Sequence, residues 1–185
     1  QDATNSGMVY TLDLMQAYPD VFHKCHDEVI QQCGPHGPVS TKVSDSLPYL
    51  RKVVNQLLHH KPPVPMVPHL CQKDNVLNGH FISKGSVVIP SITYMARSSG
   101  HALEFLPDRS DPDTQFVKTV VFGAGQHKCP GRRYAESLLT VFLGILAQEY
   151  TVERTGPRPG PDDFIFFPTL FPKDSHFLVM QRSSS

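Results

Sequence analysis

The decisive stretch of this sequence is Phe122-Gly123-Ala124-Gly125-Gln126-His127-Lys128-Cys129-Pro130-Gly131, which ends where a long amphipathic helix is expected to begin. A helix N-terminus carries a partial positive charge and free N–H groups, and both favour a thiolate over a thiol. Glycines let a flat ligand approach the backbone, and proline suits a first helical turn, where an N–H has no helical partner. We expect Cys129 to present an anionic sulfur, with a buried, inert cysteine as the alternative.

Apolar spacing outside this stretch predicts helices. One runs to Tyr18, a second starts at Pro19, a third starts near Ser46 and ends before Pro62, and the clearest runs from Pro130 to Tyr150. Short strands are expected within residues 66–90, where Asn78-Gly79 predicts a hairpin turn, and at Phe164–Phe167 and Phe177–Met180. Residues 99–121 show little periodicity. These patterns predict one domain over residues 1–185, mainly α with small β-sheets (α+β), with a Pro/Gly-rich break at 156–163.

The composition narrows the classes of partner and compartment. Lys plus Arg (17) equals Asp plus Glu (17), so no net charge favours binding to nucleic acid or to an anionic membrane surface. No run of about 18 apolar residues and no signal-peptide pattern occurs, which predicts an intracellular chain without a membrane anchor. The four cysteines are spaced irregularly, which favours a reducing compartment over a disulfide scaffold.

The spacing Phe-x-x-Gly-x-x-x-Cys-x-Gly, met here by Phe122, Gly125, Cys129 and Gly131, resembles the haem-binding signature of the cytochrome P-450 family. The resemblance implies haem b (iron protoporphyrin IX) as cofactor, with Cys129 as the axial iron ligand. It also implies that Phe122, Gly125 and Gly131 contact the haem. His127 stands at the usually basic place before the ligand, where the resemblance implies a partner for a haem propionate.

Three more blocks resemble the same family in the same order. Leu47-Pro48-Tyr49-Leu50 followed by Pro62-Pro63-Val64-Pro65 is similar to its K helix and the exit from it, residues 78–90 to the hairpin that follows, and Phe105-Leu106-Pro107-Asp108-Arg109 to its meander motif. The chain therefore looks like the C-terminal part of a truncated cytochrome P-450-like fold. Residues 1–17 would be the distal half of the I helix. The resemblance leaves a fragment and a short relative as alternatives.

The retained part departs from the family pattern in two places. In the family, the K helix carries Glu-x-x-Arg, and this ion pair meets the meander arginine. The same positions here are Gln56-Leu57-Leu58-His59. His59 stands in place of the arginine, on the cofactor side, and is a shorter and weaker hydrogen-bond donor than a guanidinium. The I-helix acid and alcohol should fall at Asp2 and Ala3, but the alcohol is Thr4, one position later. Asp2 and Thr4 are the catalytic candidates that the resemblance implies. His69 stands where the family often holds a haem propionate.

The resemblance implies a monooxygenase that acts on a small apolar organic substrate and receives electrons from a reductase. Arg132 and Arg133 are expected to face solvent or that electron donor. The alternative is a P-450-derived protein without monooxygenase activity, either haem-binding or haem-free. A zinc site at the His and Cys residues between 23 and 36 is a weaker hypothesis, because their spacing suits only half a site. An uncovered apolar face formed by Met8, Leu12 and Met15, together with the loop around His69, is expected to bind a second copy or a complementing chain.

Overall fold

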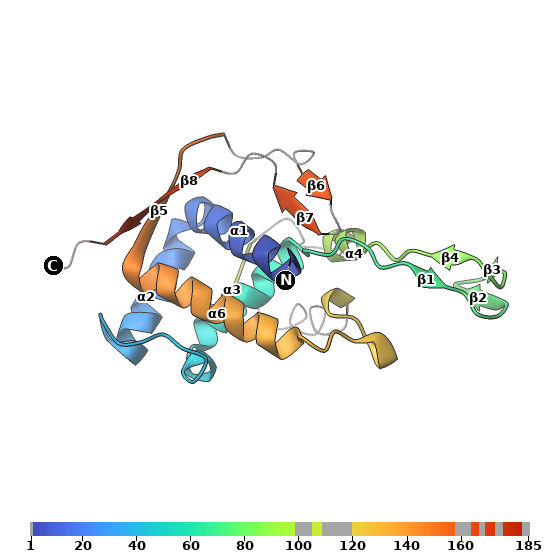
Figure 1. Ribbon diagram of the computed structural model, residues 1–185, viewed down its shortest axis with the longest axis horizontal. Coiled ribbons are helices and arrows are strands. Elements are labelled where there is room, and N and C mark those ends of the chain that lie inside the picture. Colours follow the sequence, from blue (N-terminus) through green and yellow to red (C-terminus); the bar gives the residue numbers. More distant parts are fainter. Residues whose placement is uncertain are drawn as a thin grey trace.

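Four long helices build the body of the chain in the part that the computed structural model describes, which is residues 2–98, 105–108, 120–157, 164–166, 169–172 and 176–182. They are α1 (Asp2–Ala17), α2 (Pro19–Cys33), α3 (Pro48–His60) and α6 (Arg132–Glu149) (Figure 1). A short helix, α4 (Ile92–Ser98), and two 3₁₀ turns, η1 (Ser44–Ser46) and η3 (Gly125–His127), complete the helical part. The predicted helices are confirmed, with boundaries that differ by a few residues.

Local sequence rules explain where these helices start and stop. Pro19 and Pro48 occupy the first turns of α2 and α3, where a missing N–H costs no helical hydrogen bond. Gly34 ends α2 at φ +77°, a conformation that residues with a Cβ seldom adopt. The helix α6 begins directly after Cys129-Pro130-Gly131. Because α1 ends at Ala17 and α2 begins at Pro19, the predicted boundary between two helices at Tyr18-Pro19 is confirmed.

Glycines on two elements permit the closest helix contacts of the core. A Cβ at Gly7 of α1 would lie 3.1 Å from Cδ2 of Leu139 on α6. A Cβ at Gly144 of α6 would lie 2.8 Å from Cγ1 of Val39 and 3.2 Å from Cδ2 of Leu50. Leu50 is fully buried and Leu139 is nearly so. The helix α6 therefore packs at the centre of the body because small residues let its neighbours approach.

An arm of residues 66–91 leaves the helical body (Figure 1). At its base Met66 bridges Ser91; further out β1 (His69–Leu70) pairs with β4 (Val87–Val88), and β2 (Asn75–Leu77) pairs with β3 (His80–Ile82). Asn78 and Gly79 turn the tip at φ +49° and +82°, as the Asn-Gly signal predicts. The short strands expected within residues 66–90 are present, and they form two separate two-stranded pairs on an exposed arm.

Two further antiparallel pairs lie at the C-terminal end. The strand β5 (Tyr150–Arg154) pairs with β8 (Phe177–Gln181), and β6 (Phe164–Phe166) pairs with β7 (Leu170–Pro172). The predicted strands at Phe164 and Phe177 are confirmed, whereas β5 and β7 were not predicted. Residues 158–163 of the predicted break, and Phe167, lie outside the described residues.

The expected uncovered face of residues 1–17 is wrong. Met15 is only 6% exposed, and Met8 and Leu12 are partly buried against the same core. The helix α1 is contacted by α2, α3, α6, β5 and β7, so the chain itself covers this face. Several exposed large apolar side chains lie instead on the arm, where Val76 is 63% and Phe81 is 67% exposed, and others lie on α4, α6 and the C-terminal strands.

The observed fold class agrees with the prediction: the described chain is mainly helical with small two-stranded sheets. Within the described ranges, no helix has both the length and the apolar character needed to cross a membrane.

Candidate functional site

The loop of residues 122–131 folds back on itself immediately before α6. Gly123 and Gly125 adopt φ +72° and +67°, and Gly125 is the first residue of η3. The N–H of Cys129 donates to the carbonyl of Phe122 at 2.7 Å, which closes the loop. A Cβ at Gly123 would be in ordinary contact with the His127 carbonyl oxygen at 3.5 Å, so the positive φ is what favours glycine there. The two glycines are therefore needed for the turn itself, and the turn fixes the position of Cys129 just before α6.

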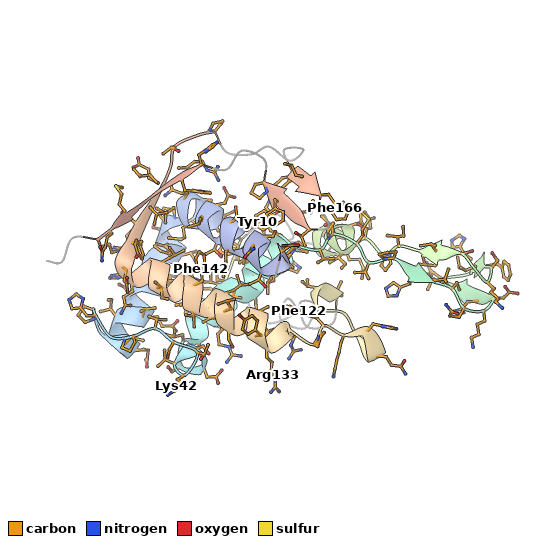
Figure 2. All side chains as sticks on the ribbon, in the orientation of Figure 1. Tyr10, Lys42, Phe122, Arg133, Phe142 and Phe166 are labelled. Carbon is orange, nitrogen blue, oxygen red and sulfur yellow. The ribbon has the colours of Figure 1, made fainter. Side chains whose placement is uncertain are left out.

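The thiol of Cys129 is exposed, and its surroundings are open. A Cβ at Gly131 would lie 3.9 Å from the Cys129 Sγ, whereas one at Gly125 would meet nothing within 4 Å. Phe122 is half-buried against the core, and its side chain is labelled in Figure 2. A soft sulfur beside open glycine backbone is a donor arrangement that suits a haem iron. These residues therefore fit the cofactor that the resemblance implies, and the alternative of a buried, inert Cys129 is wrong.

The start of α1 lies on the same side of the body as the start of α6 (Figure 1), and the two helices cross at Gly7 and Leu139. Asp2 is exposed and Thr4 is half-buried on the first turn of α1. The helix continues without a break from Asp2 to Ala17. Residues two apart on a regular α-helix point about 200° away from each other. Asp2 and Thr4 therefore do not face each other.

The three candidate histidines lie on three different elements. His127 is exposed in η3, two residues before Cys129. His69 is exposed in β1 on the arm. His59 is only 2% exposed and belongs to the buried face of α3. The structure thus brings Phe122, Gly125, His127, Cys129 and Gly131 together in one loop, with His59, His69, Asp2 and Thr4 on separate elements.

Basic side chains follow the thiol at the start of α6. The guanidinium of Arg132 lies 3.6 Å from the Glu136 carboxylate, one turn along the helix. Arg133 is exposed and points away from the helix (Figure 2). A polar cavity between α3 and α6 is lined by these residues together with Arg51. Asp45, which pairs with Arg51 at 2.5 Å, and Glu136 also line this cavity, so its charges are mixed and Arg133 adds an exposed positive charge beside the loop.

On α3, the residues at the expected ion-pair positions are buried. Gln56 is 4% exposed, and its Oε1 accepts a hydrogen bond from the N–H of Leu106 at 3.4 Å. Arg109, the meander residue that the family pattern would place opposite it, lies outside the described residues. The neutral side chain of Gln56 therefore contacts the backbone of the meander segment at Leu106.

Two residues of α2 were missed by the sequence analysis. Both carboxylate oxygens of Glu28 accept hydrogen bonds from the first turn of α3, from Tyr49 N–H at 2.8 Å and from Leu50 N–H at 2.9 Å. One turn earlier, Lys24 forms an ion pair with Asp108 at 2.7 Å. Lys and Glu four residues apart on a polar helix look like an ordinary solvated face. One signal of such a contact was present in the sequence. Leu47 precedes α3 and has no polar side chain to cap the helix, so the free N–H groups of its first turn need an acceptor from elsewhere.

Cys25 of α2 behaves as a core residue. Burial raises the pKa of the Cys25 thiol far above its ordinary value, and the nearby Glu28 carboxylate raises it further. Cys25 is therefore a protonated thiol inside the core. The described residues contain no group of three or more His, Cys, Asp and Glu side chains that could hold a metal ion, so the zinc hypothesis receives no support there.

Comparisons with known proteins place these residues in context. The sequence pattern of the family described as Cytochrome P450 matches residues 1–174. C-22 sterol desaturase erg5 of Aspergillus fumigatus is 33% identical over 182 residues, which are 94% of this chain and 35% of that protein. Probable cytochrome P450 524A1 of Dictyostelium discoideum is 35% identical over 185 residues, 94% of this chain and 34% of that protein. The chain thus spans about a third of the length of these relatives.

Solved structures show the same fold. The cytochrome P450DA heme domain superposes with a TM-score of 0.85 at 21% sequence identity, over 98% of this chain and 42% of that one. A second cytochrome P450 structure, CYP102L1, gives a TM-score of 0.81 at 23% identity, over 97% of this chain and 42% of the other. The expected truncated fold therefore matches a portion of such a domain.

Proposed function

This chain belongs to the cytochrome P450 family, and from that premise we propose that it binds haem b through the Cys129 thiolate. The observation that carries the proposal is the exposed Cys129 sulfur on a closed glycine loop at the N-terminal end of α6. When bound through a thiolate, haem supplies oxygen activation and oxidation of organic substrates. The proposed activity is that of a haem-thiolate oxidoreductase.

In this proposal the chain's own residues hold and orient the cofactor. Phe122, Gly125 and Gly131 form its contact surface, because an aromatic ring and bare backbone both suit a flat macrocycle. His127 and His69 bind the propionates as donors, and His59 supports the cofactor side of α3. Asp2 and Thr4 would each hold a proton, on different sides of α1.

We propose an apolar organic substrate, with sterols as the class to test first. A relative at 33% identity is named a C-22 sterol desaturase, which supports that choice. Electrons come from a reductase that docks on the basic surface at Arg132 and Arg133. The exposed Arg133 guanidinium beside the cofactor loop favours an acidic electron donor. A second copy or a complementing chain would cover the exposed apolar arm.

A second candidate is a P450-derived protein that binds haem without monooxygenase activity. The continuous helix at Asp2 and Thr4 favours it, because an acid and an alcohol on opposite sides of a helix cannot share one proton path directly. Product analysis with haem-loaded protein, a reductase and a sterol distinguishes the two. Hydroxylated or desaturated product supports the first, and NADPH consumption without product supports the second.

The experiment that tests haem ligation compares cysteine variants. Cys129→Ala should abolish the red-shifted absorption of the reduced carbon monoxide complex, because it removes the proposed sulfur ligand. Cys71→Ala and Cys33→Ala are the matched controls, since both carry half-buried thiols on other elements. They should keep the band. Loss of the band in Cys71→Ala alone, or its persistence in Cys129→Ala, would refute the ligand assignment.

A further inference from the structure

A polar cavity lies where η1, α3 and α6 contact one another; the two long helices are labelled in Figure 1. Its volume is about 430 Å³, within the range of roughly 300–1,000 Å³ that is usual for small-molecule sites. Among its described lining residues only Val54 is apolar, and every other one carries a hydroxyl, an amide or a charge. A ligand that suits these walls is therefore small and polar.

Helical spacing brings donors from two elements into this one cavity. Arg51 and Asn55 are four residues apart on α3, and they lie one turn apart on the same face of that helix. Arg133 and Ser137 have the same spacing on α6, and Figure 2 shows Arg133 projecting from the helix. All four residues line the cavity, so each helix contributes one guanidinium and one neutral donor. The two helices can therefore hold one bound group between them.

The ion pairs at the rim of the cavity are weak enough to be exchanged. Arg51 lies 2.5 Å from the Asp45 carboxylate, but the two side chains are 50% and 88% exposed. Arg132 lies 3.6 Å from the Glu136 carboxylate, beyond hydrogen-bond distance. Exposed pairs of this kind contribute little and are screened by salt. A phosphate group is a better acceptor for a guanidinium, because it carries more charge than a carboxylate and offers three oxygens to the planar fork.

Other parts of the cavity wall offer acceptors instead of donors. Ser44 and Thr140 are 5% and 2% exposed, and their hydroxyls donate to the carbonyl oxygens of Thr41 and Glu136, each at 2.8 Å. A hydroxyl that donates in this way keeps lone pairs for a second partner. The carboxylates of Asp45 and Glu136 accept hydrogen bonds as well, and they would repel a ligand that is anionic throughout. These oxygens suit a ligand that brings O–H donors of its own.

We propose that this cavity binds a sugar phosphate, with the phosphate held by Arg51 and Arg133 and the sugar hydroxyls held by the carboxylates of Asp45 and Glu136. The mixed charge of the walls then matches the two ends of the ligand, since the phosphate accepts hydrogen bonds and the sugar donates them. The proposal goes beyond haem binding and does not depend on it, because none of these four residues belongs to the loop of residues 122–131.

The first experiment compares three probes with the full chain at one ionic strength of about 0.15 M. Ligand-observed NMR titration gives a dissociation constant for glucose 6-phosphate, inorganic phosphate and glucose. Glucose 6-phosphate should bind about tenfold tighter than inorganic phosphate, because only the former also reaches the acceptors, and glucose should bind more weakly than glucose 6-phosphate by at least as much. Equal affinity for glucose 6-phosphate and inorganic phosphate, or no binding of glucose 6-phosphate at about 10 mM, would overturn the proposal.

The second experiment measures the same dissociation constant for glucose 6-phosphate in four variants. Arg51→Gln and Arg133→Gln should each weaken binding about tenfold, because each removes charge-assisted hydrogen bonds to the phosphate. Asp45→Asn should strengthen it about threefold, since Arg51 is released and one acceptor oxygen remains. Lys52→Gln is the matched control: it removes an exposed cation of α3 next to Arg51 but outside the described lining, and should change binding by less than about twofold.

Two results would contradict the assignment of these residues. An equal loss in Lys52→Gln and Arg51→Gln would show that general charge attraction holds the probe, and unchanged binding in Arg133→Gln would remove α6 from the site. Circular dichroism of each variant checks that the helices are kept, which is expected because the substituted side chains are exposed. Haem content is read separately by absorption, so a chain that binds haem but no sugar phosphate refutes this inference alone.

Discussion

Two cysteines of this chain occupy opposite environments. Cys129 is exposed on a glycine loop, whereas Cys25 is fully buried between α2 and its neighbours. Burial, with the Glu28 carboxylate as a second cause, holds the pKa of Cys25 far above its unfolded value. One thiol is therefore available for ligation, and the other acts as a small apolar side chain.

The raised pKa of Cys25 predicts a fall in stability at alkaline pH. The folded pKa lies above the unfolded one, so the stabilising contribution is complete below about pH 8.5 and is lost as the pH rises above that value. The loss is at most about 1.4 kcal/mol per pH unit for this one group. Urea unfolding between pH 8 and 9.5 should show a flatter pH slope in Cys25→Ala than in the parent.

Cys33→Ala is the control for that slope, because its thiol is only half-buried at the end of α2. It should retain the parent's pH dependence. Alkylation of the native chain provides an independent check: Cys129 should react first and Cys25 only after unfolding, as read by peptide mass. Equal slopes in the parent and Cys25→Ala would contradict this assignment.

At the scale of elements, the start of α3 depends on a residue from another helix. Pro48 lies in the first turn, and Leu47 provides no side-chain cap. Glu28 of α2 instead accepts hydrogen bonds from the N–H groups of Tyr49 and Leu50, at the positive end of the α3 dipole. The helix that carries Gln56 and His59 is therefore oriented from its N-terminal end by α2.

Glu28→Ala should lower the free energy of unfolding by about 1–2 kcal/mol, because it leaves two helix N–H groups without their acceptor. Glu28→Gln should lose roughly half of that amount, since one oxygen remains. Chemical denaturation at neutral pH measures both. Asp27→Ala is the matched control: its side chain is 81% exposed, and the change should stay within about 0.5 kcal/mol. An effect of Asp27→Ala as large as that of Glu28→Ala would argue against the cap.

At the scale of the whole molecule, the arm carries one group of exposed apolar side chains among the described residues. Leu70, Val76, Leu77, Phe81 and Val87 are between 57% and 67% exposed. Figure 1 shows the arm extending away from the four helices, so no described element covers it. Large exposed apolar surfaces usually mark an interface, and the arm is one candidate for such a surface.

The isolated chain should therefore associate at low micromolar concentration, through the arm and not through residues 1–17. Val76 and Phe81 are cross-strand partners, and replacing both with threonine removes apolar area while keeping strand-forming side chains. Sedimentation velocity should show the parent above the mass of one chain and Val76→Thr/Phe81→Thr shifted toward it. Tyr134→Thr, an exposed ring on α6, is the control. A parent that sediments as one chain would contradict this expectation.

Local rules let the sequence alone predict much of this chain. The apolar period of α6, the prolines at the first turns of α2 and α3, and the Asn78-Gly79 turn each act over a few residues. The same holds for the Cys129 loop, whose glycines, cysteine and helix start are adjacent in the chain. Such features follow from backbone sterics and hydrogen bonding between near neighbours.

Only the tertiary structure decided which distant segments meet. Periodicity predicts that Met8, Leu12 and Met15 share a face, but not that α6, β5 and β7 cover it. Likewise no local pattern near Glu28 predicts the start of α3 as its partner. The pairing of β5 with β8 joins segments separated by more than twenty residues. These contacts depend on how whole elements pack. The entropy cost of closing a long loop is nearly the same for many possible partners, so only the complementarity of the packed surfaces selects one of them.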